Sequence, residues 1–268
     1  MDLFLNFDMN IFQENRKYWD QRVAVHVGSE FYDVASWKAG KSSLNPPELE
    51  LLPANLKDER ILHLMCHFGQ DSISLSRMGA RVTGVDFSSK AIIQAKSFAE
   101  ELGQTTKFVQ SNLYELEEHS LGEYDIVYMS YGTLLWLDDL PRWANIVAKH
   151  LKPYGKLILV DFHPVCMSVG DDGTLFHYPY FNRQPIVETT TGSYADPQAD
   201  VGGTNITFNY SFQDILQAIL KSGLRLEQFR EWDYSPYPCF SWLEGQVAAF
   251  KHRSKVDMPY VYGLVAEK

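Results

Sequence analysis

The sequence has few cysteines, no long apolar run and fewer basic than acidic residues, and each shortage excludes a class of protein. Three widely separated cysteines in 268 residues fit reduced thiols in a cytoplasm better than a disulfide framework. No apolar run is long enough to cross a bilayer, and residues 1–6 carry an acid where a secretory signal needs bases. A formal net charge of −10 argues against nucleic acid, which usually requires a basic face. We therefore expect a cytoplasmic protein that binds neither membrane nor nucleic acid.

Apolar runs alternate with amphipathic segments between residues 45 and 162. Asn45-Pro46-Pro47-Glu48 is typical of a helix start, with an N-cap, prolines in the first turn and then an acid. Strands are predicted over about 60–65, 81–86, 107–110, 124–129 and 157–160, and helices over about 69–79, 88–103 and 138–151. This β-α succession predicts an α/β fold, a mainly parallel sheet with helices on both faces.

The alternation stops after residue 162. Residues 163 to about 208 are rich in Gly, Pro, Asp, Thr and aromatic residues, and an unstructured loop of this length is unusual in a compact domain. We interpret this segment as an inserted cap, and its aromatic content also fits a dimerisation arm. A short helix over 214–221 and strands over about 224–232 and 260–266 follow. The predicted parts are an N-terminal lid (1–44), a core (45–162), a cap (163–208) and the C-terminal part of the core sheet (209–268).

The first two predicted strands end in a pattern typical of nucleotide binding. The first runs into Met65-Cys66-His67-Phe68-Gly69, and the second ends at Asp86. A right-handed crossover brings both strand ends to one edge of the sheet, where Asp86 would accept hydrogen bonds from two ribose hydroxyls. Such bonds to a charged group contribute roughly 1.5–3 kcal/mol each. An acid at a strand end also serves as a helix cap, but Ser88 already supplies a cap for the next helix.

Two histidines and a cysteine within five positions also raise the possibility of a metal site. His63, Cys66 and His67 have the residue types that bind zinc. Alternate positions on a strand face opposite sides, so the three cannot converge without distortion, and no fourth ligand stands nearby. We expect no metal site.

Three motifs together resemble the class I S-adenosylmethionine-dependent methyltransferases, most closely a subgroup of uncharacterised bacterial small-molecule methyltransferases. They are His-Leu-Met-Cys-His-Phe-Gly (63–69), Val-Thr-Gly-Val-Asp-Phe-Ser (82–88) and Ser-Tyr-Gly-Thr-Leu-Leu-Trp-Leu (130–137). The resemblance covers roughly residues 45–165 and, more weakly, 210–268. It implies a Rossmann-like seven-stranded sheet with an antiparallel last strand, S-adenosyl-L-methionine as cofactor and a small-molecule methyl acceptor.

The resemblance also implies a set of donor-binding residues. They are Met65, Cys66, His67 and Gly69 in the first loop, Asp86 at the ribose, Phe87 and Leu113 beside the adenine ring, Asn112 at the adenine amino group, Ser130 at the sheet edge, and Tyr18 and Trp19 in a lid helix. Phe87 and Leu113 fit ordinary core packing equally well, Asn112 also fits a turn, and the Tyr-Trp pair also fits an anchor for a helix. The family loop carries an acid and three glycines where this chain has His63, Met65, His67 and Gly69. The loss of the acid removes a partner for the donor's ammonium group.

Methyl transfer needs alignment more than a catalytic triad, because the donor is already activated by its positive sulfur. Tyr131, next to the end of the fourth strand, and His163, directly after the fifth, are the candidate catalytic residues. The sequence identifies neither the acceptor nor the oligomeric state. Two other functions stay open. A nicotinamide-dependent oxidoreductase would want three glycines in the first loop, and a degenerate donor-binding or scaffold protein would bind without turnover.

Overall fold

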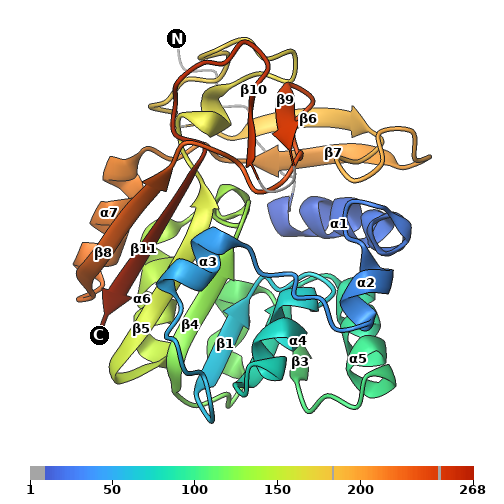
Figure 1. Ribbon diagram of the computed structural model, residues 1–268. Helices are drawn as coiled ribbons and strands as arrows, with labels where there is room; N and C mark the ends of the chain where they lie inside the picture. Colours follow the sequence, from blue (N-terminus) through green and yellow to red (C-terminus); the bar gives the residue numbers. More distant parts are fainter. Residues whose placement is uncertain (1–9, 183, 247–248) are drawn as a thin grey trace.

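A seven-stranded sheet organises the chain (Figure 1). The computed structural model describes residues 10–182, 184–246 and 249–268, so the first nine residues of the predicted lid lie outside it. The strands of the main sheet are β1 (Arg60–Leu64), β2 (Arg81–Asp86), β3 (Lys107–Gln110), β4 (Tyr124–Ser130), β5 (Leu151–Phe162), β8 (Arg225–Trp232) and β11 (Val261–Glu267). Their order is β3-β2-β1-β4-β5-β11-β8, and β11 runs antiparallel to both neighbours. This confirms the predicted Rossmann-like sheet with its antiparallel last strand.

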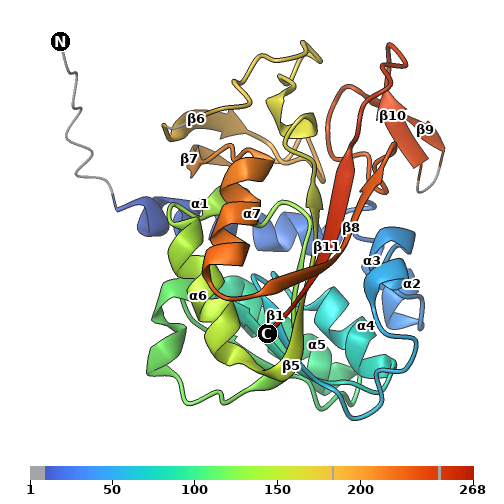
Figure 2. The same ribbon diagram turned by 90° about the vertical axis from the view of Figure 1, so that its left-hand side faces the viewer.

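Helices cover both faces of the sheet, because successive strand residues point to opposite sides. Leu62 belongs to the cluster under α6 (Leu140–His150) and α7 (Phe212–Lys221), whereas Ile61 belongs to the cluster on the other face. That second face carries α3 (Pro46–Leu51), α4 (Gln70–Arg77) and α5 (Ser89–Glu101). Figure 2 shows α6 and α7 on one side of the strands and α3 and α4 on the other.

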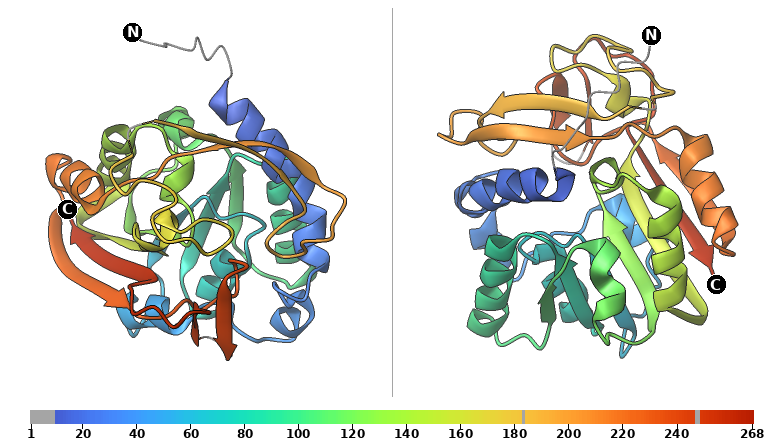
Figure 3. Two further views of the ribbon diagram at one scale, coloured as in Figure 1. Left: turned by 90° about the horizontal axis from the view of Figure 1, so that it is seen from above. Right: turned by 180° about the vertical axis from the view of Figure 1, so that it is seen from behind.

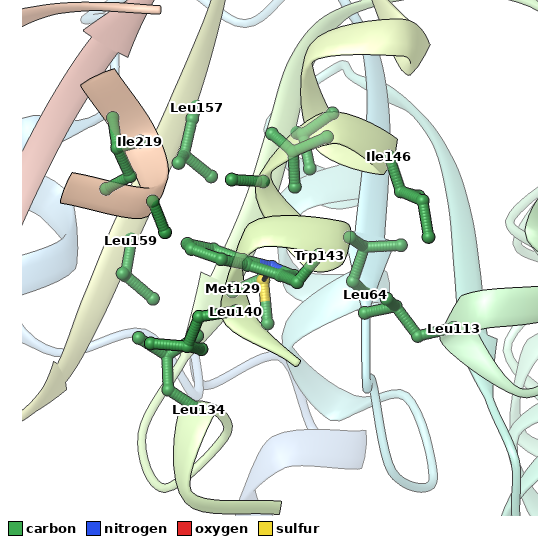
Figure 4. Packing of buried hydrophobic residues seen from close by; sticks show 14 of the residues in the cluster. Leu64, Leu113, Met129, Leu134, Leu140, Trp143, Ile146, Leu157, Leu159 and Ile219 are labelled. Carbon is green, nitrogen blue, oxygen red and sulfur yellow. Dashed lines mark hydrogen bonds between the residues drawn. The ribbon is translucent and has the colours of Figure 1, made fainter. Parts of the chain in front are cut away.

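Trp143 lies at the centre of the first face. Its ring is fully buried, and its indole N–H donates to Sδ of Met129 over 3.1 Å. The side chains packed around it include Leu64, Leu157, Leu159 and Ile219 (Figure 4). The strands whose ends form the carboxyl edge of the sheet therefore pack on a closely filled hydrophobic core.

Three further pieces lie over the carboxyl ends of the strands. They are α1 (Ile11–Gly28) with α2 (Val34–Lys38), the hairpin of β6 (Ile186–Thr191) and β7 (Gly202–Thr207), and the hairpin of β9 (Leu243–Gln246) and β10 (Ala249–His252) (Figures 1 and 3). The sequence predicted the first two. The third interrupts the C-terminal part of the core between β8 and β11, and was missed because prolines and aromatics at 233–260 leave no regular period.

Short 3-10 turns complete the described structure. They are η1 (Leu113–Glu118), η2 (Leu134–Trp136) and η3 (Cys166–Ser168). In the described ranges, no helix combines the length and the apolarity that a membrane span requires.

Candidate functional site

A cavity of about 440 Å³ lies where β1, β2, β4 and β5 end. Its walls come from the loops after these strands, from the α1–α2 region, from the β6–β7 segment and from the stretch between β8 and β11. The residues contributed by the strand ends are His63, Met65–Gly69, Asp86, Phe87, Ser130–Thr133 and Phe162. Open parallel sheets bind ligands at this edge.

The loop after β1 keeps a glycine-like backbone although two glycines of the related family are replaced. Met65, His67 and Gly69 have φ angles of +56°, +49° and +83°. A Cβ on Gly69 would lie 2.6 Å from the ring of Phe108, so this position requires glycine on steric grounds as well. For residues with a side chain, the left-handed region costs roughly 1–2 kcal/mol each. The side chains of Met65 and His67 themselves form part of the cavity wall.

Asp86 closes β2 beside this loop. Its Oδ2 accepts the backbone N–H of His67 and its Oδ1 accepts that of Ser88, both over 2.8 Å. Each oxygen keeps a further acceptor position. Burial raises the pKa of the Asp86 carboxyl to about 6, and nearby Asp20 also raises it. Ser88 caps α5 as predicted, since its Oγ accepts the N–H of Ala91.

The two aromatic residues of the lid helix α1 lie in different places. Trp19 lines the cavity, and its ring centroid is 5.2 Å from that of His67. Tyr18 does not line the cavity; its hydroxyl pairs with Oγ1 of Thr190 over 3.1 Å, and Arg22 stacks on its ring. Tyr18 therefore anchors α1 to the β6–β7 hairpin, whereas the alternative left open by the sequence was an anchor onto the main sheet.

His26 joins α1 to both the loop and the cap. Its Nδ1 lies 2.9 Å from Nε2 of His67, and its Nε2 lies 2.7 Å from Oγ of Ser193. Burial lowers the pKa of His26 to about 3, with Arg22 adding repulsion, so the imidazole is neutral at pH 7. The connection is a neutral hydrogen-bond chain across three pieces of the chain.

Asn112 and Leu113 do not line the cavity. Oδ1 of Asn112 accepts the N–H of Tyr114 and caps the turn η1. Leu113 is buried in the cluster around Trp143 (Figure 4). Both residues occupy the turn and core positions that the sequence gave as alternatives.

Two carboxyls, fully buried Glu48 and partly buried Asp71, lie beside Ser130 and Tyr131 at the end of β4. Oγ of Ser130 donates to Oδ2 of Asp71 over 3.2 Å, and the hydroxyl of Tyr131 donates to Oε2 of Glu48 over 2.9 Å. Glu48 is fully buried and also accepts the hydroxyl of Tyr128. Burial, helped by repulsion from Asp71, raises the pKa of Glu48 to about 8.

Sequence reasoning missed both carboxyls. Glu48 was recognised only as part of a helix start, and its side chain does accept the Asn45 N–H as a capping box requires. Asp71 carried no sequence signal beyond its place in the first turn of a helix.

His163 does not line the cavity. Its Nε2 lies 2.8 Å from Oε1 of Glu231, and its Nδ1 accepts the N–H of Val165. Burial lowers its pKa. Both ring nitrogens are thus engaged away from the site.

Among the cap aromatics Phe176, Tyr178, Tyr180, Phe181 and Tyr194, which the sequence suggests as an apolar lid over the pocket, one lines the cavity. Tyr194 does so, whereas Tyr178 bonds Glu188 and Tyr180 accepts the N–H of Phe212. Phe176 and Phe181 are exposed. The aromatic wall also includes Phe31 and Tyr32, which lie between α1 and α2 in the predicted lid, and Tyr237 and Phe240, which precede β9 and were not predicted.

His63, one of the three residues considered as zinc ligands, has another partner. Nδ1 of His63 lies 2.8 Å from Oγ of Ser72, and burial lowers the pKa of His63 to about 3. Across the described positions, no three His, Cys, Asp or Glu side chains gather in a metal-binding arrangement.

Comparison with known proteins agrees with this geometry. Residues 61–155 match the family described as Methyltransferase domain. A ubiquinone biosynthesis O-methyltransferase from Nitrosococcus oceani is 33% identical over 119 residues, which cover 42% of this chain and 49% of that protein. An uncharacterized protein from Haemophilus influenzae is 28% identical over 166 residues, 57% of this chain and 64% of that one. The chain thus spans less than two thirds of the length of these relatives.

Solved structures extend the likeness to the whole fold. A methyltransferase from Mesorhizobium loti that depends on S-adenosylmethionine superimposes with a TM-score of 0.57 at 18% identity, covering 86% of this chain and all of that one. Another from Clostridium acetobutylicum gives 0.56 at 11% identity, covering 98% and 94%. Residues 61–155 therefore match a methyltransferase domain, and the chain has the fold of class I S-adenosylmethionine-dependent methyltransferases. The cofactor of this class is S-adenosyl-L-methionine.

Proposed function

We propose that the protein transfers the methyl group of S-adenosylmethionine to a small-molecule acceptor bound in the same cavity. The observation that carries this proposal is the position of Asp86, a buried carboxyl at the end of β2, against the left-handed loop after β1. Both groups line one cavity with room for more than the donor's ribose.

In this proposal the donor lies along the strand ends. Asp86 accepts hydrogen bonds from the ribose hydroxyls through the acceptor positions left by His67 and Ser88. Phe87 contacts the adenine ring, and Trp19 covers the site from α1. Met65, Cys66, His67 and Gly69 form the floor beneath the donor. Asn112 and Leu113 support the adenine side from outside the cavity.

The acceptor then occupies the aromatic end of the cavity. Its walls there are Phe31, Tyr32, Phe162, Tyr194, Tyr237 and Phe240. Small-molecule sites are usually apolar with a few convergent polar groups. Tyr131 is such a group, because it lines the cavity and its hydroxyl is held by Glu48. The acceptor is therefore a compact, largely apolar molecule, and Tyr131 contacts its reacting atom.

The bound donor supplies an activated methyl group on a positive sulfur. The chain's own contribution is to align the acceptor with that methyl group and to exclude water, which supplies roughly 7–11 kcal/mol in favourable cases. When the acceptor carries a proton, Tyr131 receives it and passes its own proton to the ionised form of Glu48, over the 2.9 Å hydrogen bond between them. Because the pKa of Glu48 is about 8, only a minor fraction of Glu48 is ionised at pH 7, and transfer of such a proton should become faster as the pH rises toward 8. We also propose a cytoplasmic location, where the unpaired Cys66, Cys166 and Cys239 stay reduced.

Calorimetry with S-adenosylmethionine, S-adenosylhomocysteine and NAD tests the donor. We expect the first two to bind and NAD not to bind. Transfer of a labelled methyl group to a panel of phenols and amines then tests turnover. An enzyme that binds NAD in preference, or neither sulfur ligand, would contradict the proposal.

A further inference from the structure

We propose that Asp71 binds the ammonium group of the donor's amino-acid end, replacing the acid that the class usually carries where this chain has His63. The inference rests on the proposed function, because it assigns a residue to one part of the same site.

Asp71 has the right place for this contact. It lies in the first turn of α4, two residues after Gly69, and its side chain lines the cavity. Its Oδ2 accepts the hydroxyl of Ser130 at the end of β4, the strand next to β1. The carboxyl therefore lies between the donor loop and the acceptor end, where the amino-acid part of the donor must pass if the ribose binds Asp86.

Asp71 also has no cationic partner within the described ranges 10–182, 184–246 and 249–268. Among the described residues, no lysine, arginine or histidine forms a salt bridge with it. Lys41 lines the cavity, but it bonds Asp33 at 3.0 Å and its side chain is two-thirds exposed. Burial raises the pKa of Asp71 in this surrounding, with its Ser43 and Ser130 hydrogen bonds opposing that effect. A partly buried carboxylate without a counter-ion is destabilising even when hydroxyl groups donate to it, and a ligand cation relieves this cost.

His63 cannot perform this role. It is almost fully buried, its ring packs on that of Tyr128, and its Nδ1 is engaged by Ser72. A neutral imidazole offers no charge to an ammonium group. In this proposal the acidic partner of the donor's ammonium group is Asp71 at the start of α4, eight positions after His63 in β1.

Three ligands separate the ammonium contact from the rest of the donor. S-adenosylhomocysteine carries both the ammonium and the carboxylate, 5′-(3-aminopropylthio)-5′-deoxyadenosine keeps only the ammonium, and 5′-methylthioadenosine has neither. None carries a sulfonium, so attraction of Asp71 to the positive sulfur does not enter. We expect Asp71→Asn to weaken the first two at least tenfold and the third less than twofold. Asp58→Asn, on an exposed acid paired with Arg81, is the charge-matched control and should change none.

The outcomes are distinct. Wild-type protein that binds none of the three ligands would refute the proposed function itself. Wild-type binding with unchanged affinity in Asp71→Asn would overturn only the assignment of Asp71. Equal weakening of all three ligands would also overturn it, because Asp71 would then only shape the site. The melting temperature of ligand-free Asp71→Asn should equal or exceed that of the wild type, since the variant removes a carboxylate that has no counter-ion and keeps an oxygen that accepts the Ser130 hydroxyl. Asp71→Ser provides a second variant for the same comparison.

Discussion

The backbone N–H of His67 donates to Oδ2 of Asp86 over 2.8 Å and ties the loop after β1 to the end of β2. His67 adopts a left-handed backbone to do so, with φ of +49°. The N–H of a glycine in the same conformation would make the same bond. Histidine in place of the family's glycine therefore adds a side chain to the loop and keeps the hydrogen bond between the loop backbone and Asp86. The His67 side chain is then free to meet His26 of the lid.

Asp86 should therefore be essential for donor binding. We expect Asp86→Ala to weaken S-adenosylhomocysteine at least tenfold, because two hydrogen bonds from ribose to a charged acceptor are lost. Calorimetry measures the effect, and Asp58→Ala is the control. Circular dichroism should show a folded protein, since only backbone N–H partners near the surface of the cavity are released. An unchanged dissociation constant would remove Asp86 from the ribose site.

The lid helix offers a matched pair of neighbours. Trp19 lines the cavity and Tyr18 does not, so Trp19→Ala should weaken S-adenosylhomocysteine several-fold while Tyr18→Phe leaves it nearly unchanged. Aromatic faces also attract a sulfonium by roughly 0.5–2 kcal/mol. Trp19→Ala should therefore weaken S-adenosylmethionine binding more than S-adenosylhomocysteine binding. Equal effects of the two variants would show that α1 acts as a whole and that Trp19 has no contact of its own.

Gly69 should tolerate no side chain. Gly69→Ala must place a Cβ against the Phe108 ring at a φ of +83°, whereas Gly103→Ala has a φ of +60° and open space around its Cβ. The second variant therefore measures the cost of the left-handed backbone alone, about 1–2 kcal/mol. Gly69→Ala should lower the free energy of unfolding by about a further 1–3 kcal/mol, because its Cβ overpacks against the Phe108 ring. Urea denaturation that gave both variants the same free energy of unfolding would contradict the steric argument.

The fold was predictable because it follows from local periodicity. The strand ends at Asp86 and Ser130 and the cap at Ser88 can each be inferred from a few neighbouring residues. The site is less accessible to such reasoning, because its walls converge from segments far apart in the chain. Asp71, Glu48 and Tyr237 belong to three such segments, and no spacing in the sequence connects them. Asn112 and Leu113 were selected by position after a strand, but capping and core packing decide where their side chains lie.

Glu48 should make the stability of the protein depend on pH in an unusual direction. Its pKa is about 8 in the folded protein, against 4.5 for an ordinary glutamate. Between these values the folded state holds a proton that the unfolded state has released, so stability falls as pH rises. The fall approaches about 1.4 kcal/mol per pH unit within that window. Asp71 contributes in the same direction, whereas buried His26 and His63 act oppositely below pH 6.5.

Glu48→Gln isolates this contribution. Glutamine fills the same space and does not titrate, so the free energy of unfolding of the variant should gain on that of the wild type as pH rises from 5 to 8. Its changed hydrogen bonds to Tyr128 and Tyr131 shift the difference by a constant and leave its slope with pH unaffected. Glu117→Gln is the control, because Lys149 lowers the pKa of exposed Glu117 and keeps its titration below this range. Urea denaturation at four pH values measures both differences. A difference between wild type and Glu48→Gln that stays level from pH 5 to 8 would show that Glu48 is already ionised over this range in the folded protein and that its pKa is not raised.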